Sequence, residues 1–216
     1  MIQDIWPKHL DNQYKNLKPG NEDTVFYFQG SSLLARPSGH FNLQNSEENV
    51  LIYPQYDEFV QGIKSSYGDK AVDNFEFIYL LSIDEEHFFL ARKTGSLERG
   101  TFLGEMADSA VHKDMYSFVR GYEFIGVDSF RKAQPREHAY AAITAFHLYG
   151  WYRDNHFCGR CGKPLKHDDK QRMLRCDCCK NMVFPKICPA VIVAVTDKDR
   201  ILLTKYAGRT YRNYAL

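Results

Sequence analysis

The first 157 residues of this 216-residue chain contain no cysteine, and all six cysteines fall between positions 158 and 188. Secreted disulfide-rich domains distribute their cysteines over the whole framework, so this clustering argues against that class of protein. It indicates instead a metal site in a reducing compartment, with zinc as the expected metal.

The chain also lacks a long hydrophobic run. No stretch approaches the roughly 18 consecutive apolar residues of a membrane helix, and residues 1–6 show no basic-then-apolar signal pattern. We therefore expect a cytoplasmic protein without membrane contact. Because 44% of the residues are hydrophobic and 14% aromatic, the chain has enough apolar surface to bury a core, which excludes disorder of the whole chain.

Neither sign of charge is in excess, since 28 Lys and Arg face 27 Asp and Glu. This balance excludes nucleic-acid binding through bulk charge alone. The distribution is uneven, however: residues 158–188 carry eight basic and three acidic side chains, or +5, and the remainder carries 20 and 24, or −4. A basic segment of this kind either contacts phosphates or is a solvated surface, and we favour the solvated surface.

The N-terminal region is predicted to be rich in β-structure and to end in one strong helix. The helix is expected to start near Pro135 and to end near Trp151, because its apolar residues recur at helical spacing. Runs of β-branched and aromatic residues predict strands, and weaker patterns predict two short helices. The strands are expected at 24–29, 75–83, 87–92 and 122–130, and the short helices at 58–66 and 105–119.

Two C-x-x-C pairs follow the long helix, Cys158 with Cys161 and Cys176 with Cys179. This spacing is typical of a zinc ribbon, in which two knuckles complete a tetrahedral thiolate shell, so these four cysteines are the predicted ligands. Gly159 and Gly162 suit the knuckle turn, because a residue without Cβ accepts positive φ. Such a closed site has no open coordination position, which predicts a structural rather than a catalytic zinc.

Three further side chains near the pairs are candidate ligands. We expect Cys178 to point away from the metal, because pairing Cys176 with Cys179 preserves the C-x-x-C spacing. His156 and His167 could replace a thiolate, but four cysteines already fill the shell. We therefore interpret both histidines as solvated loop side chains.

Two apolar runs after the ribbon, 190–195 and 201–206, surround a polar turn and predict a β-hairpin that begins a new domain. About 27 residues cannot bury a core by themselves. The hairpin is therefore expected to depend on the preceding domains or on further chain.

The order of these features resembles the NADH pyrophosphatase family of Nudix hydrolases. The resemblance rests on the helix into Trp151, on Phe-Cys-Gly-x-Cys-Gly at 157–162, on the second C-x-x-C and on Phe-Pro-x-Ile-x-Pro-Ala-Val-Ile-Val at 184–193. It covers residues 125–216. It implies an α+β protein with an N-terminal domain at 1–153, a Cys₄ zinc ribbon at 154–189, and the first β-hairpin of a Nudix α/β/α domain at 190–216.

The sequence departs from the family in one respect. The Nudix box, G-x5-E-x7-R-E-U-x-E-E-x-G-U, is absent, and the nearest fragment, Arg136-Glu137, lacks the paired acids that follow. Those carboxylates hold the catalytic Mg²⁺ or Mn²⁺ ions. The chain therefore looks truncated before the box, and we expect no catalytic residues and no activity from it alone.

The resemblance implies an enzyme that cleaves the pyrophosphate of NAD(H) to nicotinamide mononucleotide and AMP, with NAD-capped RNA as a further expected substrate. It also implies a homodimer. Phe184 is expected to stack on a base at the nucleotide pocket and Ile192 to add to that pocket. Core packing of the ribbon against the hairpin is the alternative for both residues, and for Ile192 we weigh it at least equally. The alternative function is a non-catalytic zinc-ribbon module that binds a nucleotide, nucleic acid or a protein partner.

Overall fold

The structure is a computed structural model that describes residues 3–39, 50–94, 117–189, 191–205 and 214–215. The chain divides into two compact units, Met1–Pro185 and Lys186–Leu216, and each is described by itself. The cysteine pairs and the N-terminal region thus lie in one unit. The boundaries predicted at residues 153 and 189 stay predictions.

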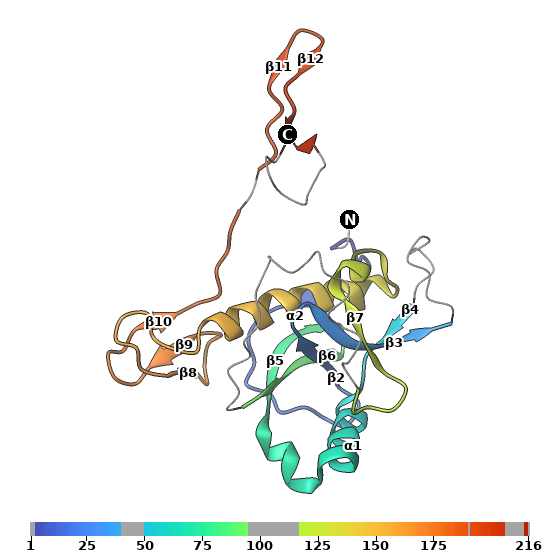
Figure 1. The fold of residues 1–216 in the computed structure, drawn as a ribbon, viewed down its shortest axis with the longest axis vertical. Helices are drawn as coiled ribbons and strands as arrows, with labels where there is room; N and C mark the ends of the chain where they lie inside the picture. The colour runs from blue at the N-terminus through green and yellow to red at the C-terminus, as the bar shows by residue number, and fades with distance from the viewer. Residues whose placement is uncertain (1–2, 40–49, 95–116, 190, 206–213, 216) are drawn as a thin grey trace. The chain divides into compact units, whose positions relative to one another are not determined.

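A seven-stranded sheet with two helices forms most of the first unit (Figure 1). The strands follow the order β1-β5-β6-β2-β3-β4, with β7 paired to β3, and only the β2–β6 pair is parallel. The strands are β1 Leu10–Asp11, β2 Thr24–Gln29, β3 Ser32–Ser38, β4 Val50–Ile52, β5 Phe75–Ile83, β6 Glu86–Lys93 and β7 Glu123–Gly126. The helices are α1 Tyr56–Tyr67 and α2 Arg136–Asp154, with 3₁₀ turns η2 Asp69–Asn74 and η3 Val127–Lys132.

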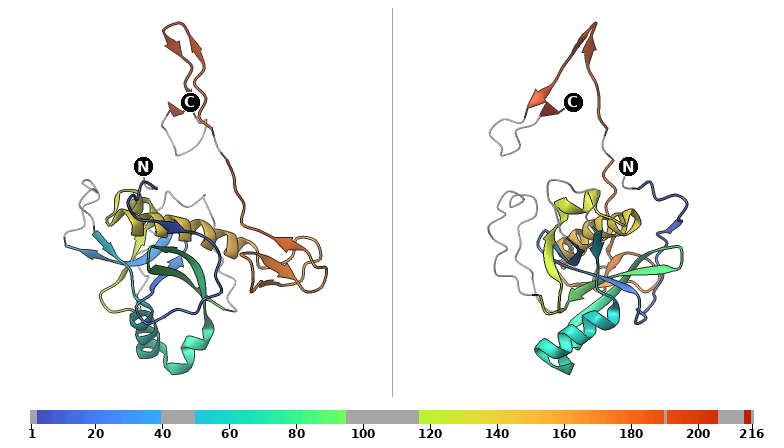
Figure 2. Two further views of the ribbon diagram at one scale, coloured as in Figure 1. Left: turned by 180° about the vertical axis from the view of Figure 1, so that it is seen from behind. Right: turned by 90° about the vertical axis from the view of Figure 1, so that its right-hand side faces the viewer.

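The sheet is covered on both faces, with α1 and α2 on opposite sides (Figures 1 and 2). Alternate residues of β2 enter different cores: Phe26 and Phe28 pack in the cluster that contains α2, and Val25 and Tyr27 pack in the cluster that contains α1. Strands buried on both faces are apolar at every position rather than at every second one. This explains the unbroken apolar run that predicted β2.

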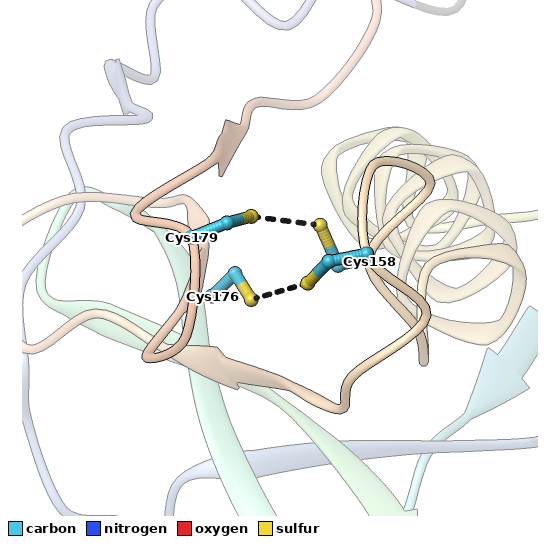
Figure 3. A group of neighbouring side chains, drawn as sticks. Cys158, Cys176 and Cys179 are labelled. Carbon is cyan, nitrogen blue, oxygen red and sulfur yellow. Dashed lines mark hydrogen bonds between the residues drawn. The ribbon is translucent and has the colours of Figure 1, made fainter.

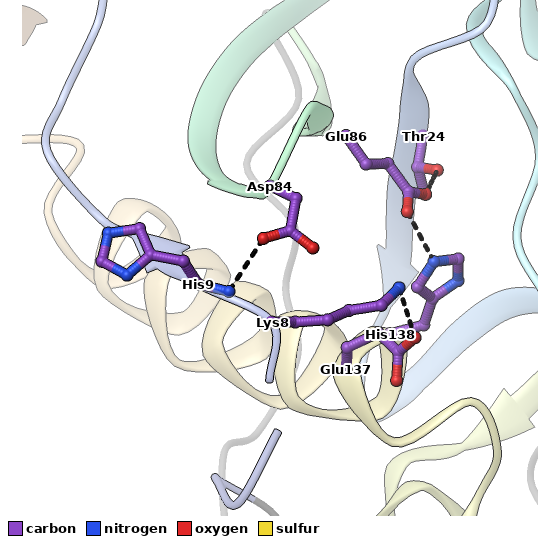
Figure 4. Close-up of polar contacts among 7 residues, drawn as sticks. All are labelled: Lys8, His9, Thr24, Asp84, Glu86, Glu137 and His138. Carbon is purple, nitrogen blue, oxygen red and sulfur yellow. Dashed lines mark hydrogen bonds and ion pairs between the residues drawn. The ribbon is translucent and has the colours of Figure 1, made fainter. Parts of the chain in front are cut away.

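The N-terminal arm, residues 3–14, is held against the β5–β6 turn and the start of α2 (Figure 4). Leu10 pairs with Ile83 at the edge of the sheet. Three polar contacts reinforce this region: Lys8 Nζ to Glu137 Oε1 at 2.7 Å, the His9 amide to Asp84 Oδ1 at 2.9 Å, and His138 Nε2 to Glu86 Oε2 at 2.8 Å. The start of the helix that leads into the ribbon is therefore held by residues from the beginning of the chain.

Most of the predicted elements of the N-terminal region are confirmed. β2 has the predicted bounds, β5 and β6 form the predicted hairpin, and α1 and α2 occupy the expected positions. The strand predicted at 122–130 is wrong after Gly126, because Val127 and Phe130 both turn into the core, and the three-residue spacing suits the 3₁₀ turn found there. The helix predicted at 105–119 lies almost wholly outside the described residues.

The second unit contains two short strand pairs, β11 Thr196–Asp197 with β12 Arg200–Ile201, and β13 Thr204–Lys205 with β14 Tyr214–Ala215. The polar turn was predicted correctly, but residues 191–195 form no strand. Their side chains, such as Val191 and Ile192, are exposed rather than packed on a neighbouring strand. The interpretation of this unit as the start of a Nudix domain stays a prediction.

No helix in the described ranges combines the length and apolar character needed to cross a membrane.

Candidate metal centre

Two similar turns carry the four predicted ligands. In the first, the Gly162 amide donates to the Cys158 carbonyl at 2.8 Å, and in the second the Lys180 amide donates to the Cys176 carbonyl at 3.0 Å. The residue after each turn's second cysteine has positive φ, 70° at Gly162 and 60° at Lys180. The predicted positive φ is confirmed at Gly162 and is wrong at Gly159.

Neighbouring elements bring the two turns together. The first turn follows the end of α2, and the second begins where β9 ends at Cys176. β9, Leu174–Cys176, is the central strand of a three-stranded antiparallel sheet with β8, Leu165–His167, and β10, Met182–Val183. A helix end and a strand end thus hold the cysteine pairs on opposite sides of one site (Figure 3).

The sulfur atoms of Cys158, Cys161, Cys176 and Cys179 all lie within 4.8 Å of one another. The Sγ atoms of Cys158 and Cys179 are 3.5 Å apart, and those of Cys161 and Cys176 are 3.4 Å apart. Zn–S bonds of about 2.3 Å in a tetrahedron place sulfur atoms about 3.8 Å apart, which falls inside this range. The four thiols therefore fit a tetrahedral thiophilic metal such as Zn²⁺.

The electrostatics of the site also fit a cation. Burial opposes ionisation of Cys158, but hydrogen bonds from the Arg160 and Cys161 amides outweigh it and lower the pKa of Cys158 to about 6. At Cys161 the hydrogen bond from the Lys163 amide lowers the pKa, but contacts with the Cys176, Cys179 and Cys158 thiols, together with desolvation, outweigh it and raise the pKa to about 12. Ionisation of one thiol opposes ionisation of its neighbours, because the negative charges would lie close together. A bound divalent metal would compensate that charge.

The other candidate ligands lie outside the four-cysteine group. Cys178 is exposed, in agreement with the prediction that it points away. The interpretation of His167 as a solvated loop residue is wrong, because it is partly buried and lies in β8, whereas His156 does lie in a loop and is partly exposed. His167 Nε2 is 2.7 Å from the Tyr152 hydroxyl, and Nδ1 is 3.4 Å from the Tyr14 hydroxyl.

Arg172 is a residue whose role the sequence did not indicate. It was counted with the basic surface of the ribbon, but its guanidinium is partly buried, donates to the Leu80 carbonyl of β5 and lies over the Tyr14 ring at 5.8 Å. No local pattern could have distinguished it, because its contacts come from residues 92 and 158 positions away. The solvated basic surface is smaller than the sequence suggested.

The two predicted nucleotide-binding residues belong to different units. Phe184 lies in the first unit and is 49% exposed, and Ile192 lies in the second and is 81% exposed. Both side chains are therefore accessible within their units. Their place at a nucleotide pocket stays a prediction.

No protein-family model matches the chain. Curated proteins named NAD-capped RNA hydrolase NudC do match part of it. The protein from Pseudomonas aeruginosa is 38% identical over 55 residues, 26% of this chain and 20% of the relative. The protein from Salmonella typhi is 36% identical over 59 residues, 27% of this chain and 23% of the relative. The protein from Pseudomonas putida is 40% identical over 55 residues, 26% of this chain and 20% of the relative.

The matched segment spans about a fifth of the length of these curated relatives. The comparison with curated proteins thus confirms the predicted resemblance to the NADH pyrophosphatase family. Over about a quarter of its length, the chain is similar to NAD-capped RNA hydrolases of the NADH pyrophosphatase family.

Proposed function

We propose that this chain provides the structural zinc centre and N-terminal domain of a Nudix hydrolase that acts on NAD(H) and NAD-capped RNA. The observation that supports it is the four-cysteine cluster in a chain similar to NudC proteins. Cys158, Cys161, Cys176 and Cys179 would hold the zinc. Because four thiolates fill a tetrahedral shell, this metal would stabilise the ribbon rather than activate water.

The chemistry of the proposed reaction requires groups beyond this cluster. Mg²⁺ or Mn²⁺ would supply charge stabilisation at the diphosphate, held by Nudix-box carboxylates that the 216-residue sequence does not contain. Phe184 would stack on a base of the substrate, and Ile192 would contribute apolar surface. We further propose that the active protein is a homodimer and that this chain alone does not hydrolyse NADH.

We would compare the purified 216-residue chain with a longer product of the same gene that carries a Nudix box. The quantity measured is the conversion of NADH to AMP in the presence of Mg²⁺ or Mn²⁺. We expect turnover only from the protein that carries the box. Metal-dependent cleavage by the 216-residue chain would disprove its inactivity. A box-bearing protein that hydrolyses neither NADH nor NAD-capped RNA would disprove the proposed function.

A second candidate function is a non-catalytic module that binds nucleic acid through the ribbon. It is favoured by exposed cations such as Arg160, Lys163 and Arg175 and by the missing box. Charge reversal at Lys163 and Lys166 should then weaken RNA binding, whereas the same reversal at Lys70, in η2, should not. Arg172 is unsuitable for this test because it is partly buried against β5. Binding unchanged by the ribbon reversals would exclude this function.

A further inference from the structure

The ribbon sheet has an inner face that is part of the N-terminal core. Strand register aligns His167, Leu174 and Val183 in one row across β8, β9 and β10. Leu174 is 2% exposed and belongs to the cluster that contains α2, and Val183 packs against that cluster. The next row on this face pairs Leu165 with Cys176. A metal ligand therefore lies two residues from the side chain that enters the core.

Polar contacts hold the same face in place. His167 lies between the hydroxyls of Tyr152, on α2, and Tyr14, in the N-terminal arm. The Arg172 guanidinium donates to the Leu80 carbonyl. These groups and Leu174 form the seat of the ribbon, which we define as Tyr14, Leu80, Tyr152, His167, Arg172 and Leu174.

Both cysteine turns are carried by elements of this seat. Cys158 follows α2 by four residues, and α2 also carries Tyr152. Cys176 is the last residue of β9, which also carries Leu174. A metal bonded to both turns would therefore connect α2 to β9 directly, across the seat. Loss of the metal would leave this connection to the seat contacts alone.

We propose that the four-cysteine site and the seat of the ribbon are thermodynamically coupled, so that metal binding tightens the seat and the seat residues, none of them ligands, raise the affinity for metal. This inference rests on the proposed zinc site but not on hydrolase activity. Coupling of two binding equilibria is reciprocal, so it is measurable from either side.

The first measurement is zinc affinity, determined by competition with a chromophoric chelator under reducing conditions. Tyr14→Phe removes one hydroxyl in the N-terminal arm, outside the ribbon, and Leu174→Ala removes the buried side chain. We expect the zinc dissociation constant to rise at least about 5-fold for Leu174→Ala, and by less for Tyr14→Phe. Met182→Ala is the matched control, because Met182 lies on the opposite, exposed face of the same sheet and should bind zinc like the unmodified chain.

The second measurement needs no variant and covers the case in which Leu174→Ala fails to fold. Amide hydrogen exchange of the unmodified chain is compared with zinc bound and after chelation. We expect faster exchange at residues 78–82 of β5 and 148–152 of α2 when zinc is removed. Exchange in α1 should stay unchanged, because α1 packs on the opposite face of the sheet.

Two results would overturn the coupling. In the first, zinc binds, but neither the variants nor chelation changes affinity or seat exchange, which leaves the zinc site of the proposed function intact. In the second, the chain binds no zinc, which also removes the proposed zinc centre. If this chain binds zinc tightly and hydrogen exchange in the seat responds to zinc, but the box-bearing protein has no hydrolase activity, only the proposed enzyme is refuted.

Discussion

Cys176 and Cys178 are two positions apart in the sequence, yet only Cys176 is buried and within reach of the other three sulfurs. We expect Cys176→Ser to lower the zinc content from about one equivalent to near zero, because a structural zinc loses much of its binding energy with one thiolate. Cys178→Ser is the matched control and should keep the full equivalent. Elemental analysis after gel filtration measures both, and equal zinc in the two variants would contradict the ligand assignment.

The four cysteines could be predicted at the residue scale, because C-x-x-C spacing forms a tight turn that directs both of its thiols toward one metal. The position of His167 could not be predicted, since Tyr14 is 153 positions away and Tyr152 belongs to a helix whose rotation the sequence did not determine. The same holds for Arg172. Local patterns indicate which groups can bind a metal, but not which polar side chains a distant segment will bury.

At the scale of elements, apolar patterns predicted β2, β5, β6 and α2. These predictions are confirmed because each element packs against a core of the first unit. The run at 191–195 was equally apolar, but its side chains are exposed and it forms no strand, although the Leu202 amide donates to the Val195 carbonyl at 2.9 Å. Strand formation depends on a partner as much as on composition. The sequence therefore predicted elements well where the described residues bury them in a core.

The contact between β8 and α2 should make stability depend on pH through His167. Burial lowers the pKa of His167, an effect that Glu76 and a backbone hydrogen bond with Asp168 oppose and that Arg92 and Arg172 reinforce. The unfolded chain therefore takes up a proton before the folded chain does, and stability falls as the pH drops below about 6.5.

We expect the urea midpoint of the unmodified chain to fall more between pH 7.5 and 5.5 than that of His167→Gln, which keeps a polar side chain but does not titrate. Ionisation of the cysteines affects both proteins and cancels in the difference. Parallel pH dependences would show that His167 does not contribute.

At the scale of the whole molecule, both buried clusters lie within Met1–Pro185, and none of the described residues of the second unit belongs to either. We expect a chain of residues 1–185 to keep its zinc and to unfold within about 2 °C of the full chain, because its hydrophobic stabilisation is intact. Differential scanning calorimetry with elemental analysis measures both. A loss of many degrees or of zinc would show that residues 186–216 stabilise the first unit.

The N-terminal arm has a consequence for the order in which the protein is made. Its Tyr14 contacts the ribbon residues His167 and Arg172, and Leu10 pairs with Ile83 of β5. These partners are synthesised long after the arm, and contacts that close long loops form late. On the ribosome, β2, β5 and β6 can assemble before the ribbon emerges. Residues 3–14 are therefore synthesised before these partners, yet they are among the last segments to find all of their native contacts.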